Sequence, residues 1–140
     1  MSIVFTVQLL PVFVAALVSF MVGWLWYSPS LFGKVWMEAS KLTKESMTKS
    51  KKKGMTGTII IGFIAQLVMA WVLSVFISAS GGANWIEGLN VAFWAWLGFV
   101  ATIGLGMVLW EGKSMKLFWI NMLHWLVALL IMGAILGAWM

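Results

Sequence analysis

Four long, almost uncharged apolar runs, separated by short polar stretches, organise the chain. They cover residues 3–27, 55–79, 87–110 and 117–139. A helix rises 1.5 Å per residue, so about 20 residues cross the ~30 Å hydrocarbon core of a bilayer. The runs lack the alternation of membrane strands, and backbone in lipid must satisfy its own hydrogen bonds. The pattern predicts an all-α integral membrane four-helix bundle in one transmembrane domain, residues 1–140.

The first run has no basic residues before it and no small-residue cleavage site, so we expect a retained helix and not a signal peptide. It ends in GWLWYSPSLFGKVW, residues 23–36. Pro29 keeps Ser28 away from the helical region and can itself start a new helix. The residues after it present an apolar face beside Lys34, whose ammonium can reach headgroups. This segment predicts a break at Ser28–Pro29 and a short interfacial helix, with Gly33 packed tightly against the bundle.

Lysine divides the connecting segments into two kinds. Seven lysines lie between the first and second runs, and Lys113 and Lys116 lie between the third and fourth. The segment SASGGANWIE, residues 78–87, has none. Because short cytoplasmic loops are rich in lysine, we expect segment 34–53 and loop 111–116 to be cytoplasmic. Both termini then lie outside a multi-pass protein of the cell (cytoplasmic/inner) membrane.

The basic linker KLTKESMTKSKKK, residues 41–53, has two interpretations. Its lysines can bind the anionic headgroups of membrane lipids, or they can serve only as a topology signal in a solvated linker. The lysines are not interleaved with aromatic residues, and the chain has no arginine. Nucleic acid is therefore not an expected partner.

Composition limits the chemistry that is open to the chain. Hydrophobic residues make up 63% and charged residues 9%, whereas soluble domains carry about 25% charged residues. Cysteine is absent and there is one histidine, so disulfides, thiolate catalysis and the common metal sites are not expected. No catalytic or phosphate-binding motif is present. We expect no cofactor, no metal and no catalytic residue. The 11 tryptophans suit aromatic belts at the two membrane interfaces.

Polar side chains within the runs are the candidates for a polar bundle interior: Gln66, Asn90, Asn121 and His124. Polar residues in membrane helices usually face other helices or a cavity. For His124 two interpretations stand. It can form a proton relay with Asn121 and Glu111, or it can be a neutral histidine that is hydrogen-bonded within the bundle.

The fourth run carries a small-xxx-small pair, Gly133 and Gly137, about half a turn away from His124. Such pairs let helix backbones approach closely. The pair predicts either a contact in a homo-oligomer or close approach of a neighbouring helix in the same chain.

Aromatic and charged residues of the two basic segments fall on the same predicted side of the membrane. We expect a groove there that takes a lipid or a partner. Its candidate residues are Trp26, Tyr27, Phe32, Trp36, Glu111, Lys113 and Lys116.

Two segments resemble a known family. They are GWLWYSPSLFGKVWM near the N-terminus and WEGKSMKLFWINMLHWLVALLIMGAIL near the C-terminus. Together they are similar to the uncharacterised bacterial membrane proteins called domain of unknown function 1761. The resemblance implies a small four-helix membrane protein and supplies no activity, substrate or site residues.

The sequence leaves three functions open. The first is a structural, interaction or lipid-binding membrane protein that self-associates as a homo-oligomer. The second is a pathway for a small solute, ion or proton along the polar bundle residues. The third is an enzyme that acts on lipid.

Overall fold

A computed structural model describes residues 9–40 and 55–139 of the protein. Its elements are α1 (Leu9–Trp26), α2 (Gly33–Ala39), α4 (Met55–Ala79), α5 (Trp85–Ala95), the π-helix η1 (Trp96–Ala101), α6 (Thr102–Glu111) and α7 (Met115–Ala138). Four stretches are long and apolar enough to span a membrane: α1, α4, Trp85–Glu111 and α7. This confirms the predicted helical membrane bundle. The start of run 3–27 and the basic linker 41–53 lie outside the described residues.

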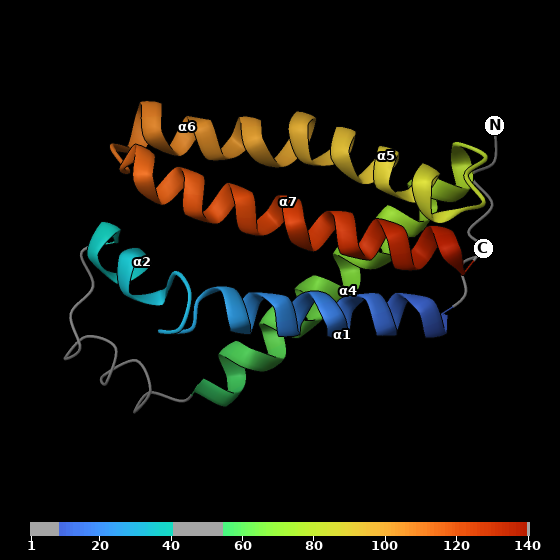
Figure 1. Ribbon diagram of the computed structural model, residues 1–140, viewed down its shortest axis with the longest axis horizontal. Coiled ribbons are helices and arrows are strands. Elements are labelled where there is room, and N and C mark those ends of the chain that lie inside the picture. Colours follow the sequence, from blue (N-terminus) through green and yellow to red (C-terminus); the bar gives the residue numbers. More distant parts are fainter. Residues whose placement is uncertain (1–8, 41–54, 140) are drawn as a thin grey trace.

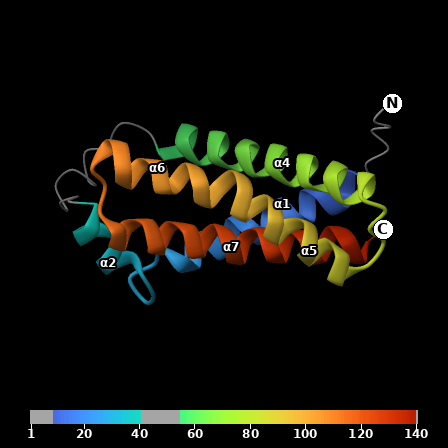
Figure 2. The ribbon, with the colours of Figure 1, turned by 90° about the horizontal axis from the view of Figure 1, so that it is seen from above.

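α7 is the central helix of the bundle. It packs against α1, α2, α4, α5, η1 and α6, and half of its most apolar stretch is buried. Figure 1 shows α7 between α1 and the helix formed by α5 and α6, with α4 crossing obliquely behind. Figures 1 and 2 both place α2 beside the α6–α7 turn at one end of the molecule. The α4–α5 turn and the end of α7 lie at the other end.

α5 and α7 approach so closely that backbone meets backbone. A methyl group on Gly133 would collide with the carbonyl of Gly88, and one on Gly137 would collide with the carbonyl of Asn84. Glycines permit this approach because they lack the Cβ that keeps helices apart. The structure thus places the glycine pair against a helix of the same chain. Self-association of the protein stays a prediction.

The third span contains a π-helical segment, Trp96–Ala101. A π-bulge adds one residue to a helix and so turns the rest of the span by about 100° relative to an unbroken α-helix. Gly88 and Gly104 are both buried against α7, on either side of this segment. In a regular helix Asn90 would share the face of Gly104. Because of the inserted residue, Asn90 is exposed instead.

The break after α1 is confirmed. α1 ends at Trp26, and residues 27–32 form turns before α2 begins. The amide groups of Leu31 and Gly33 both donate to the Ser28 carbonyl, at 3.1 and 2.9 Å. These bonds hold the chain in a turn, which explains why α2 starts at Gly33 and not at Pro29. Gly33 is buried, and a Cβ there would collide with the carbonyl oxygens of residues 27 and 28.

Candidate functional site

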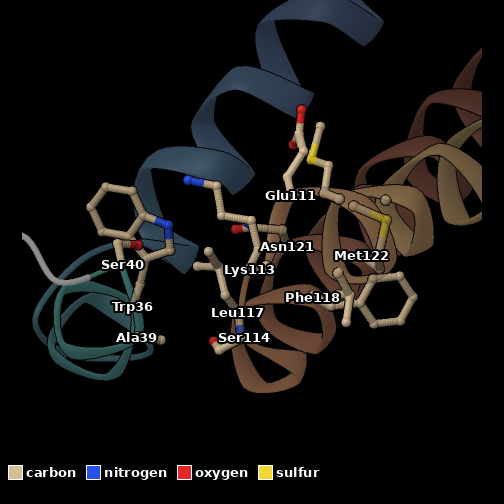
Figure 3. A pocket seen from close by; sticks show the side chains of 14 residues that line it. Trp36, Ala39, Ser40, Glu111, Lys113, Ser114, Leu117, Phe118, Asn121 and Met122 are labelled. Atoms are coloured by element: carbon tan, nitrogen blue, oxygen red, sulfur yellow. Dashed lines mark hydrogen bonds between the residues drawn. The ribbon is translucent and has the colours of Figure 1, made fainter.

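A pocket of about 580 Å³ opens where α2 meets the α6–α7 turn (Figure 3). The figure shows side chains from α2, the turn and α7 around it. Apolar walls come from α6 and α7, and polar groups come from both helices, the turn and α2. The lining includes Trp36, Ser40, Gly104, Met107, Val108, Glu111, Lys113, Leu117, Phe118, Asn121 and Met122.

The pocket lies between the turn that joins α6 to α7 and the point further along the two helices where they come into contact. The contact is made by Gly104, where a methyl group would collide with the Met122 side chain. At the same level Trp96 Nε1 donates to the Met122 carbonyl oxygen at 2.8 Å. The turn itself is well fixed, since Gly112 adopts φ +69° and Ser114 caps α7 by accepting from the Leu117 amide at 3.0 Å.

One hydrogen bond joins the end of α1 to this pocket. The Tyr27 hydroxyl donates to Asn121 Oδ1 at 2.6 Å. The Tyr27 ring also meets the Trp36 ring edge-on, with ring centres 5.6 Å apart. These contacts place the Asn121 amide and the Trp36 indole at the pocket wall.

Burial changes the acidity of this tyrosine. It raises the pKa of Tyr27 to about 12, from an ordinary value of 10.0. The cause is desolvation, which disfavours the charged phenolate. Tyr27 therefore stays a neutral hydrogen-bond donor to Asn121 over the whole physiological pH range.

The mouth of the pocket carries groups with open hydrogen-bonding capacity. Lys113 and Glu111 are exposed, and within the described residues neither forms an ion pair. Figure 3 shows the two side chains extending in separate directions from the rim. Asn121 uses only its oxygen within the described part of the chain, so both of its N–H bonds are available.

His124 lies behind the pocket and does not line it. It is 4% exposed and sits among aromatic rings, with ring centres 5.1 Å from Tyr27, 6.1 Å from Trp26 and 4.8 Å from Trp125. Neither ring nitrogen has a hydrogen-bond partner within the described residues. The structure therefore shows neither a bond to Asn121, as in the relay, nor the expected hydrogen-bonded histidine. Its buried place is explained by ring packing between α7 and the end of α1.

The four candidate residues of a polar interior do not meet. Gln66 Oε1 accepts from Ser19 at 2.8 Å, which joins α4 to α1. Asn90 is exposed and accepts from Trp94 Nε1 at 3.1 Å. Asn121 and His124 lie one turn apart on α7, but only Asn121 reaches the pocket.

The predicted groove coincides with the pocket in part. Trp36, Glu111 and Lys113 line it. Trp26 and Tyr27 stand behind, where Trp26 Nε1 donates to the Ile120 carbonyl at 3.1 Å. Phe32 stacks at a tilt against Trp26, with ring centres 4.7 Å apart. Lys116 is exposed on the first turn of α7 and is not part of the lining.

Sequence reasoning placed Asn121 in the bundle and missed its position at the pocket wall. The signal was its distance from the basic turn: Asn121 lies only two turns into α7 after Ser114. It also missed the apolar walls, Met107, Val108, Leu117 and Phe118, because nothing distinguishes them from lipid-facing residues in an apolar run.

The pocket is equipped for binding. Its lining includes the hydroxyls of Ser40 and Ser114 but no histidine that could activate either of them. Among the described residues there is no cluster of histidine, aspartate or glutamate that could hold a metal ion. The lining offers a charged mouth and an apolar interior.

Comparison with known proteins agrees with the resemblance of the two segments. The family described as "Protein of unknown function (DUF1761)" matches residues 10–137. No curated protein and no solved structure matched the chain. The match includes α2, nearly all of the four spans and every residue that lines the pocket. The chain therefore belongs to the DUF1761 family.

Proposed function

We propose that the protein is a lipid-binding membrane protein that holds one phospholipid in the pocket between α2, α6 and α7. The headgroup lies at the mouth, beside Lys113. An acyl chain lies along the apolar walls between α6 and α7. The observation that carries the proposal is the combination of a charged mouth and apolar walls in a pocket of about 580 Å³ at the end of the spans.

The position of the pocket supports this function. It lies beside the short α6–α7 turn, so its mouth is at headgroup level when α6 and α7 span the bilayer. The lysine distribution favours the cytoplasmic side for this end. Lysines placed near the membrane surface are attracted to the negative charge of lipid headgroups, and Lys113 lines the pocket where it can meet a headgroup phosphate.

The test is a comparison of two serine-to-tryptophan variants. In Ser40→Trp the new indole enters the pocket, because Ser40 lines it. In Ser30→Trp it lies on the exposed turn before α2. Native mass spectrometry of the full chain in detergent, with added phospholipid, counts the lipids that stay bound. We expect the wild type and Ser30→Trp to retain one lipid that Ser40→Trp loses.

Helical content and size-exclusion profiles confirm that both variants are folded. Equal lipid retention by the two variants would contradict the proposal, because the bound lipid would then lie elsewhere.

A further inference from the structure

We propose that the pocket is selective for an aminophospholipid, whose headgroup carries both a phosphate and a primary ammonium. This inference rests on the proposed lipid binding. It goes further because it assigns separate tasks to Lys113 and Glu111 and predicts a preference between headgroups.

The first argument is the pair of opposite charges at one mouth. Glu111 ends α6 and Lys113 follows two residues later, and both line the pocket. Neither forms an ion pair with the other or with another residue in the described part of the chain. A headgroup with one negative and one positive group would give each a partner.

The second argument concerns the donors around the phosphate position. Lys113 supplies an ammonium, and Asn121 supplies two N–H bonds that no described residue uses. Trp36 adds an indole N–H at the same pocket, which also has no acceptor within the described residues. Phosphate oxygens only accept hydrogen bonds, and bonds to a charged acceptor are the stronger ones. These donors therefore match a phosphate and not a second cation.

The third argument is the carboxylate. Glu111 is the acidic residue of the lining. A primary ammonium donates three hydrogen bonds to such an acceptor. A quaternary ammonium is charged but has no N–H to donate, and a glycerol headgroup has hydroxyl donors but no positive charge, so neither gives Glu111 a charged hydrogen-bond donor. The expected order of affinity places phosphatidylethanolamine above phosphatidylcholine and phosphatidylglycerol.

Native mass spectrometry of the full chain in detergent tests this order with three phospholipids that share the same acyl chains. We expect phosphatidylethanolamine to bind about fivefold more tightly than the other two, the range of a partly exposed ion pair. Glu111→Gln should remove this preference while phosphatidylglycerol binding stays the same or rises. Lys113→Gln should weaken all three lipids.

Matched controls carry the same charge changes outside the pocket. Glu38→Gln on α2 and Lys116→Gln on α7 alter residues that do not line it, and we expect wild-type behaviour from both. Equal binding of the three lipids by the wild type would overturn the selectivity and leave lipid binding intact. The same holds if Glu38→Gln removes the preference as Glu111→Gln does. Binding of none of them would overturn both proposals.

Discussion

At the scale of single residues, two contacts fix how neighbouring helices pack on α7, one beside the pocket and one at the opposite end of the helix. Tyr27 reaches from the end of α1 to Asn121 on α7, and so holds one wall of the pocket in place. Gly133 lies against Gly88 at the other end of α7 and holds α5 close. Loss of the Tyr27 hydroxyl, or one added methyl group at Gly133, would remove the corresponding contact.

The tyrosine can be observed directly. Tyr27 is the only tyrosine in the chain, so phenolate absorbance near 295 nm reports it alone. We expect a midpoint at about 12 in the folded protein and about 10 after unfolding. Between these values the unfolded chain releases a proton that the folded chain keeps. The contribution of this group to the free energy of unfolding is therefore fully present below pH 10 and is lost as pH rises from about 10 to about 12. A folded midpoint near 10 would show that the ring is solvated.

The glycine contact predicts a large loss of stability. Gly133→Ala forces a methyl group into the backbone of α5, and we expect a loss of about 3 kcal/mol or more. Gly57→Ala is the control, because a Cβ there meets nothing within 4 Å, and it should be neutral or stabilise by about 0.5 kcal/mol. Unfolding in mixed detergent measures both. Similar stability of the two variants would contradict the close approach.

At the scale of elements, α2 and the π-helix decide where polar residues end up. α2 returns toward α7 because the turn after α1 is closed by bonds to the Ser28 carbonyl. The π-helix turns α6 so that Gly104 faces α7 while Asn90 is exposed. The pocket needs both, because α2 supplies one wall and α6 another.

The placement of α2 can be tested through its first residue. Gly33→Ala puts a methyl group against two backbone carbonyls, so the turn must open and Trp36 must leave the pocket wall. We expect a stability loss of about 1–3 kcal/mol together with weaker lipid retention in native mass spectrometry. Ser30→Ala, in the exposed part of the same turn, should change neither. Unchanged lipid retention in Gly33→Ala would show that α2 does not form the site.

At the scale of the whole molecule, the two ends of the bundle differ in character. One end holds α2, the pocket and the turn with Lys113, and the other holds the α4–α5 turn and the end of α7. The loop at the pocket end carries Lys113, whereas the α4–α5 loop at the other end has no lysine. This distribution of lysine predicts that the pocket end is cytoplasmic.

The absence of cysteine makes this orientation easy to measure. Single cysteines at Lys113 and Ser80 mark opposite ends, since both residues are exposed on turns. In intact cells a membrane-impermeant maleimide should label Ser80→Cys, and Lys113→Cys only after permeabilisation. The cysteine-free chain is the control for background labelling. The reverse pattern would place the pocket on the outer side.

Most of the fold could be predicted from the sequence, and part of the site. The spans, the break at Ser28–Pro29 and the short helix after it follow from local patterns that neighbours do not alter. Three of the predicted groove residues line the pocket, namely Trp36, Glu111 and Lys113. They could be predicted because interfacial aromatic residues and loop charges indicate how deep a residue lies in the membrane. The exposed position of Asn90 could not be predicted, because helical periodicity assumes about 100° per residue and the π-helix does not follow this spacing.

The sequence by itself determined that this chain forms four membrane helices, because apolar length is a property of each segment alone. It also determined the family, because the two segments that carry the resemblance are read directly from the residues. Only the tertiary structure decided the partners of its polar and small residues. It set Tyr27 against Asn121, Gly133 against Gly88, and His124 among aromatic rings. It also created the pocket. The reason is that in an apolar helix every side can face either lipid or protein, so the choice of face depends on packing between helices.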